Sequence, residues 1–164
     1  MKKLVLGLML GAVENSSTII PVNAATTGSV SVGYEADSIS ENPDENWYVS
    51  LPKDVNFTDN VTTANMNVGL HSYKGNFFSD FTVDVTVESA NTYKLNGQNG
   101  AFDYTLEYDG RTMSGSEKEV GELSATTNTS SDELTGTAEL DVSSGPHAAD
   151  GKYTDTLTYT ITKK

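Results

Sequence analysis

The chain has 164 residues, of which 23 are acidic and 10 basic, so its formal net charge is −13. Such a surface repels the phosphates of nucleic acids and of anionic membranes, and no nucleic-acid partner is expected. The absence of cysteine excludes disulfides, cysteine nucleophiles, iron–sulfur clusters and thiolate zinc sites, and the length suits a single domain.

The N-terminus has the three parts of a secretory signal peptide. Lys2 and Lys3 form a basic start, residues 4–13 form an uncharged apolar core, and Ala24 precedes a cleavage point. The apolar core is shorter than the about 20 residues that cross a bilayer. We therefore expect a signal peptide over residues 1–24 and one exported domain over residues 25–164, with no membrane insertion of the mature chain. A short N-terminal helix docked on the domain is the alternative.

The exported part has the pattern of a series of short strands. Apolar residues fall on alternate positions in residues 28–36, 47–57, 64–70, 81–88, 102–108, 134–142 and 153–161. Turn signals such as Asn96-Gly97 and Asp109-Gly110 lie between them, and a weaker segment contains Val120 and Leu123. No stretch after residue 25 has helical spacing over three turns. The pattern predicts an all-β protein, an antiparallel β-sandwich of about seven to nine strands.

The final strand is the clearest of the series. Tyr153, Leu157, Tyr159 and Ile161 alternate with threonines, which are β-branched and tolerate water on the opposite face. Burial of an apolar side chain of this size stabilises a fold by about 1.5–3 kcal/mol, a gain that requires a second sheet opposite. This strand therefore predicts a partner sheet.

Residues 150–161, which read Asp-Gly-Lys-Tyr followed by Thr-Asp-Thr-Leu-Thr-Tyr-Thr-Ile, resemble the closing strand of a known class of domains. These are the small secreted immunoglobulin-like surface and adhesin-type proteins of Gram-positive bacteria. The resemblance implies an immunoglobulin-like sandwich that is secreted or extracellular, or held non-covalently on the cell wall. The spacing of Asp150 and Tyr153 also resembles a tyrosine corner, in which the tyrosine hydroxyl bonds to nearby backbone.

The sequence offers few groups for catalysis. His71 and His147 are the only histidines, and no Gly-x-Ser-x-Gly motif is present. Asp103 and Glu107 would lie about 13–14 Å apart along one strand. Paired carboxylates in glycosidases lie about 5–9.5 Å apart, so these two do not fit, although a cross-strand carboxylate pair stays open. We expect a protein that is not an enzyme.

An acidic segment before the only tryptophan is a candidate calcium site. Asp37, Glu41, Asp44 and Glu45 gather around a polar turn, and calcium takes six to eight oxygen ligands. A solvated acidic loop is the alternative, because a chain this acidic forms such clusters by chance. No other cofactor is expected.

Two tyrosines are candidates for glycan binding. Trp47 shares its parity with Val49 and Leu51, which predicts that it lies in the core, whereas Tyr48 points the other way. The ring of Tyr48, together with that of Tyr34, could stack on the C–H face of a sugar.

These observations favour an exported, non-enzymatic cell-surface or extracellular protein. Its expected role is adhesion, surface structure or the binding of a protein or glycan partner. One alternative is a carbohydrate-binding module, with calcium as a candidate cofactor. A second alternative is a pilus or coat subunit that assembles by strand exchange, which requires an open sheet edge.

Overall fold

The computed structural model describes residues 6–9, 19–20, 26–27, 46–58, 60–146 and 152–164. In this part of the chain there is no helix, and fourteen strands form three antiparallel sheets. The predicted all-β, antiparallel fold is therefore confirmed, with more strands than predicted because several are only two to four residues long. None of the described residues belongs to a helix that could span a membrane.

The first sheet is built around the C-terminal strand. Its strands, in spatial order, are β1 (Leu6–Met9), β14 (Thr156–Lys163), β7 (Phe81–Ser89) and β11 (Glu119–Ala125), and β3 (Thr26–Thr27) pairs with β14 next to β1. Because β1 and β2 are strands, the docked-helix alternative for the N-terminus does not hold for the described residues of that segment.

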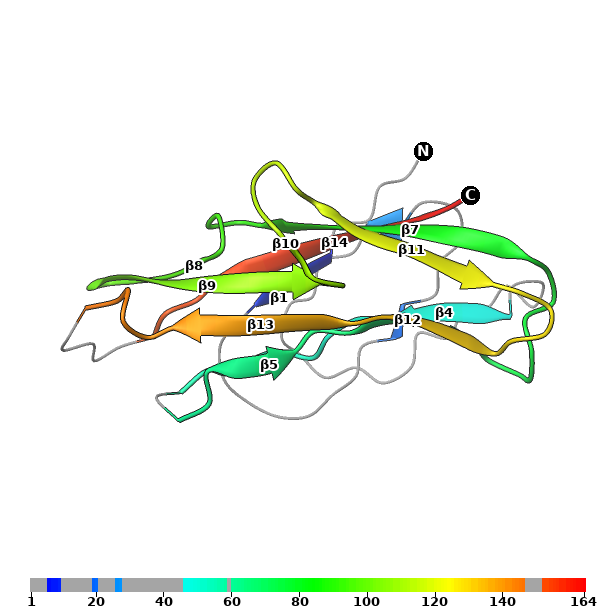
Figure 1. Ribbon diagram of the computed structural model, residues 1–164, viewed down its shortest axis with the longest axis horizontal. Helices are drawn as coiled ribbons and strands as arrows, with labels where there is room; N and C mark the ends of the chain where they lie inside the picture. The colour runs from blue at the N-terminus through cyan, green and yellow to red at the C-terminus, as the bar shows by residue number, and fades with distance from the viewer. Residues whose placement is uncertain (1–5, 10–18, 21–25, 28–45, 59, 147–151) are drawn as a thin grey trace.

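Two further sheets face the first one. The second has the order β10 (Arg111–Thr112), β9 (Gly100–Tyr108), β13 (Gly136–Asp141) and β5 (Thr63–Asn65), with β8 (Lys94–Gly97) paired to β9. The third has the order β12 (Ser131–Leu134), β6 (Val68–Ser72), β4 (Trp47–Ser50) and β2 (Ile19–Ile20). Strand β12 runs into β13 across Thr135, so these two sheets continue each other across from the first sheet, an arrangement consistent with a β-sandwich (Figure 1).

The core lies between these layers and follows the predicted alternation. Fully buried side chains come from all three sheets: Val83, Val85, Leu123, Leu157, Leu106, Tyr108, Val49, Val68 and Leu70. Trp47 is only 3% exposed, which confirms its predicted place in the core. Strand β14 therefore buries its apolar face as the sequence predicted.

A pair of tyrosines joins the two layers in the core. The hydroxyl of Tyr108 on β9 donates to the carbonyl oxygen of Met66 at 2.7 Å. It also lies 2.7 Å from the hydroxyl of Tyr159 on β14, which can therefore donate to it. Burial raises the pKa of both Tyr108 and Tyr159 above the usual value, so both hydroxyls stay protonated. Gly136 makes room for this pair, because a Cβ there would lie 2.3 Å from the Tyr108 ring.

Asp155, which is 1% exposed, fixes the start of β14. Its carboxylate accepts hydrogen bonds from the hydroxyls of Ser89 and Tyr104, both at 2.6 Å, and from the backbone N–H groups of Asn91 and Thr156 at 3.0 and 2.7 Å. A buried carboxylate is tolerated when donors surround it in this way. Asp155 thus ties β14 to the end of β7 and to β9.

The predicted tyrosine corner is not formed in the described part of the chain. The Tyr153 hydroxyl is buried there without a hydrogen-bond partner, and its ring packs edge-on against Phe102 at 4.9 Å. Asp150, the other half of the predicted motif, lies outside the described residues, as does the predicted strand over residues 28–36.

Candidate functional site

The outer face of β4 and β6 carries a group of polar and aromatic side chains. In the antiparallel register Tyr48 lies opposite His71 and Ser50 lies opposite Gly69. Trp47 and Val49 point into the core, so Tyr48 and Ser50 point outward, as the strand parity predicted. The two outward side chains of β4 are half-buried, which leaves part of each ring or hydroxyl open to a ligand.

Three rings form a row on this face. The Tyr48 ring stacks on the His71 imidazole with a centroid distance of 5.1 Å and an interplanar angle of 29°. The Tyr48 ring also contacts the Tyr73 ring, with a centroid distance of 4.8 Å and an interplanar angle of 38°. We call Tyr48, His71 and Tyr73 the aromatic surface; all three are half-buried.

The imidazole of His71 is held by its neighbours on the sheet. Its Nε2 lies 2.8 Å from the Ser50 Oγ. A Cβ on Gly69 would lie only 2.4 Å from that Nε2 and 2.8 Å from the Ser50 Oγ, so the ring rests across the glycine. Burial lowers the pKa of His71 and outweighs the opposing effect of Glu133, which favours the neutral imidazole.

A buried asparagine positions the turn that carries Tyr73. The Asn46 side-chain nitrogen lies 2.6 Å from the Ser72 hydroxyl and 3.1 Å from the carbonyl oxygens of both Lys74 and Asn76. The Tyr73 N–H donates to the Asn46 carbonyl at 3.2 Å. The Tyr73 hydroxyl has no hydrogen-bond partner among the described residues. The turn is therefore held by Asn46, while the Tyr73 hydroxyl is buried and unsatisfied.

Ser50 and His71 have the spacing of a nucleophile and its base, but their surroundings do not suit catalysis. Among the described residues Glu133 makes no hydrogen bond to the imidazole; its carboxylate instead accepts from the Asn67 amide at 2.9 Å. The Ser50 Oγ also lies 3.4 Å from the Gly69 carbonyl oxygen, which would repel an oxyanion rather than stabilise it. The pair therefore fits the role of orienting the imidazole.

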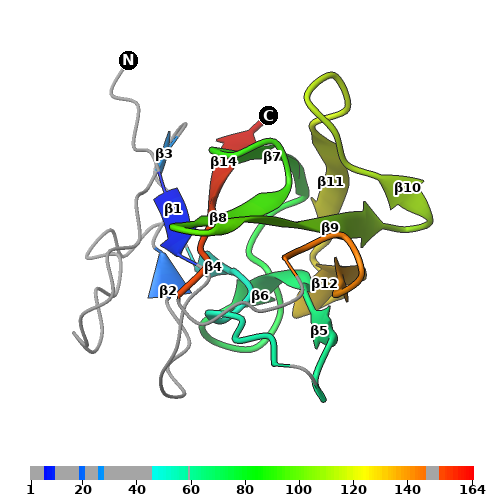
Figure 2. The ribbon, with the colours of Figure 1, turned by 90° about the vertical axis from the view of Figure 1, so that its left-hand side faces the viewer.

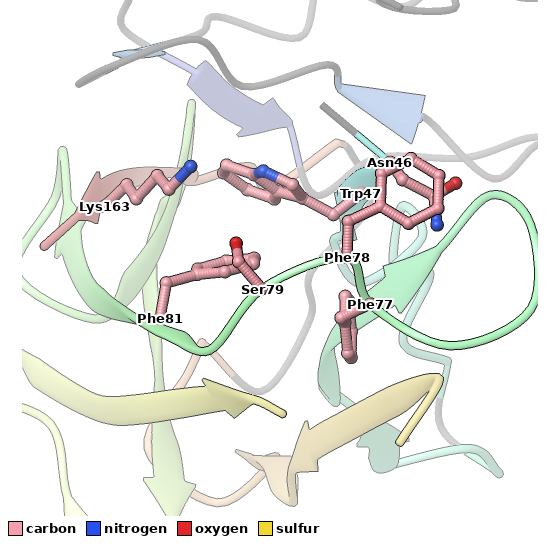
Figure 3. A pocket seen from close by; sticks show the side chains of 7 residues that line it. All are labelled: Asn46, Trp47, Phe77, Phe78, Ser79, Phe81 and Lys163. Carbon is pink, nitrogen blue, oxygen red and sulfur yellow. The ribbon is translucent and has the colours of Figure 1, made fainter. Parts of the chain in front are cut away.

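A small pocket lies at the N-terminal end of β4 (Figure 3). Its volume is about 30 Å³, room for about one water molecule, and its lining consists of Asn46, Trp47, Phe77, Phe78, Ser79, Phe81 and Lys163. The Lys163 ammonium lies 5.3 Å from the Trp47 ring centre and 4.6 Å from that of Phe81. This arrangement is cation–π packing at the edge of the core, with the 64% exposed Phe78 at its rim.

The two carboxylates of β9 that the sequence analysis rejected as a glycosidase pair each contact a different neighbour. Asp103 pairs with Lys94, and the Glu107 carboxylate accepts from the Thr112 hydroxyl at 3.0 Å. The register does bring a cross-strand partner, Asp141, opposite Asp103. Hydrogen bonds from Ser143 lower the pKa of Asp141, whereas a glycosidase acid needs a raised pKa.

The candidate calcium residues Asp37, Glu41, Asp44 and Glu45 lie outside the described residues, as do Tyr34 and His147. Within residues 46–58, 60–146 and 152–164, no group of three or more histidine and carboxylate side chains could hold a metal ion. No family model, no curated protein and no solved structure matches the chain. The geometry of the aromatic surface is therefore the main guide to function.

Sequence reasoning found one member of this surface and missed two. Tyr48 was predicted from its parity next to Trp47. His71 lies 23 residues further along the chain and Tyr73 lies in a turn, so only the pairing of β4 with β6 brings them together. A signal was present in the glycine two residues before His71, which leaves space on the sheet for a neighbouring ring.

Proposed function

We propose that the protein is exported and acts without catalysis as a binding protein at the cell surface or outside the cell. An immunoglobulin-like β-sandwich is the scaffold in this proposal. The basic and apolar N-terminus supports export, with secretion or non-covalent wall association as the destination. The antiparallel all-β architecture, with the threonine-rich strand β14 in the first sheet, supports the scaffold.

The observation that carries this proposal is the row of rings made by Tyr48, His71 and Tyr73. Aromatic rings with one polar end suit ligands that have both an apolar face and hydroxyl groups. A sugar has this character, because its C–H face stacks on a ring while its hydroxyls can bond to polar groups beside the rings, such as the half-buried His71 imidazole. A neutral glycan also avoids repulsion by the acidic chain. The proposed ligand class is therefore carbohydrate. Whether calcium assists the binding is tested together with it.

A glycan array tests the proposal. The full chain is applied with calcium and with a chelator, beside the variants Tyr48→Ala and Phe78→Ala. Phe78→Ala is the matched control, because it removes an exposed ring outside the aromatic surface. We expect glycan binding that Tyr48→Ala abolishes and Phe78→Ala preserves. Absence of binding under both conditions, or equal binding by all three proteins, would refute the proposal.

A subunit that assembles by strand exchange is the second candidate. It is favoured by the pairing of β14 with β1, because β1 comes from the segment predicted to be removed on export. Size-exclusion chromatography of the exported protein over a wide concentration range tests it. Elution as a monomer at every concentration would remove this candidate and leave the first one standing.

A further inference from the structure

The backbone groups of β14 divide between its two edges. The Thr156 carbonyl accepts from the Ala90 N–H at 2.9 Å, and the Lys164 N–H donates to the Thr82 carbonyl at 3.0 Å. Even-numbered residues of β14 therefore direct their backbone groups toward β7. Since these groups alternate along a strand, Leu157, Tyr159 and Ile161 direct theirs toward the opposite edge.

Two segments cover that opposite edge. Strand β1 pairs with it from Thr156 to Tyr159, and β3 pairs with Thr160 and Ile161. Figure 2 shows β1 and β3 together on one side of the molecule. The predicted cleavage point after Ala24 separates these two strands in the sequence. Strand β1 lies before it, in the part that is removed, and β3 lies after it, in the part that is kept.

The proposed export of the protein, on which this inference rests, changes the edge of β14. Removal of residues 1–24 takes β1 away and leaves the N–H and C=O groups of Leu157 and Tyr159 without strand partners. Ile161 keeps its pairing with β3, which lies in the retained chain.

Cleavage also removes β2 from the edge of β4, but the opened edge of β14 is the one that has none of the usual protection against pairing. Natural edge strands carry charged residues, proline or bulges. Residues 156–160 are Thr-Leu-Thr-Tyr-Thr, without charge or proline. The neighbouring Asp155 does not help, because its carboxylate is buried and bonded inward. This edge is therefore suited to adding another strand.

We propose that the exported protein forms a closed two-fold dimer in which β14 pairs with β14 of a second copy, centred on Thr158. In this antiparallel register Leu157 lies opposite Tyr159 of the second copy, and the reverse pair forms on the other side of the axis. Each pair exchanges two backbone hydrogen bonds. The N–H and C=O groups that form them are those that face β1 in the full chain, where Leu8 lies opposite Leu157 and Leu6 lies opposite Tyr159. Strand β3 occupies the rest of the edge, so the pairing closes at two copies.

Cleavage of the folded full chain tests the opening of the edge. A site-specific protease sequence is placed after Ala24, and amide hydrogen exchange is followed before and after cleavage. We expect the amides of Leu157 and Tyr159 to be protected in the full chain, to exchange at least about tenfold faster in the dilute cleaved protein, and to regain protection as concentration and dimer fraction rise. The Ile161 amide is the internal control and stays protected throughout.

Charge substitutions at the proposed axis test the identity of the partner. Thr158 would lie opposite itself with Cα atoms about 4.5 Å apart, so Thr158→Lys and Thr158→Glu each place like charges together. Analytical ultracentrifugation of the cleaved protein should show that either variant weakens dimerisation at least about tenfold and that an equal mixture of the two restores it. Thr160→Lys is the matched control, because it lies on the same face but next to β3, and it should leave the dimer intact.

Three results would overturn the dimer. The first is a monomer at all concentrations with fast exchange at Leu157 and Tyr159. The second is a protected monomer, which would mean that another part of the same chain covers the edge. The third is a polymer, which would mean that the pairing does not close. The proposed cleavage fails separately, if the protein recovered from the medium of a secreting host still has the mass of residues 1–164, and the proposed export fails if the protein stays inside that host.

Discussion

Gly69 determines where the His71 imidazole lies. A Cβ at this position would meet the His71 Nε2 at 2.4 Å. Gly69→Ala should therefore push the ring off the strand, break its contact with Ser50 and disturb the stacking on Tyr48. We expect glycan affinity to fall at least about tenfold while the free energy of unfolding falls by only about 1 kcal/mol. Array binding and urea unfolding measure the two effects.

Gly115→Ala is the control for this substitution, because a Cβ there meets nothing within 4 Å. It should change neither quantity. Full glycan affinity in Gly69→Ala would show that the position of the His71 ring is unimportant for binding.

The His71 imidazole also makes stability depend on pH. Burial lowers its pKa from the ordinary value of 6.5, so the unfolded chain binds this proton more readily than the folded one. The stabilisation is fully present above the unfolded-state pKa and is lost as the pH falls through 6.5 toward the folded-state value. Urea unfolding from about pH 7.5 to about pH 5 should show a loss of stability on acidification.

His71→Gln separates this effect from every other titrating group. The variant should lose less stability than the natural chain over the same pH range. An equal or larger loss in His71→Gln would contradict the assignment to His71.

The tyrosine pair between β9 and β14 predicts an unequal response to two similar substitutions. Tyr108→Phe leaves both the Met66 carbonyl and the Tyr159 hydroxyl without a partner in the core, which should cost about 2–3 kcal/mol. Tyr159→Phe leaves the bond from Tyr108 to Met66 intact and should cost about 1 kcal/mol. Urea unfolding measures both. Equal costs, or the reverse order, would show that the pair does not share its protons in this way.

Whole strands could be predicted where alternation runs uninterrupted, as in β7, β9 and β14. Prediction failed where the chain changes sheets. Ala64, Met66, Val68 and Leu70 alternate without a break, yet β5 ends at Asn65 and β6 begins at Val68 in another sheet. The Asn65 side chain accepts the Asn67 N–H at 2.9 Å and so stabilises the break, a local bond that side-chain parity does not reveal.

Two other strands were misjudged for related reasons. Residues 47–57 were predicted as one long strand or as two short ones broken at residues 52–54. Only the first part, β4, is a strand, because Pro52 lacks the N–H that would continue the ladder, and residues 51–57 contain none. Strand β11 looked weak because a register shift between Glu119 and Gly121 puts Val120 and Leu123 out of alternation, although both are fully buried.

At the level of the molecule, the layered all-β fold and the acidic charge could be predicted from the sequence, whereas most of the aromatic surface could not. Charge and the strand rhythm are properties of the chain as a whole, so composition and parity report them directly. The aromatic surface depends on which strands pair and in which register, and the pairing of Tyr48 with His71 follows from no local pattern. The acidic chain with a polar aromatic face is best matched to a neutral ligand that stacks, which is the basis of the proposed glycan binding.

The most direct measurement is an NMR titration of the full chain with the glycan that the array selects. We expect the ring signals of Tyr48, His71 and Tyr73 to shift together as the glycan saturates, while those of the exposed Phe78 do not. Saturation without a change at these three rings, or with changes centred on Phe78, would contradict it.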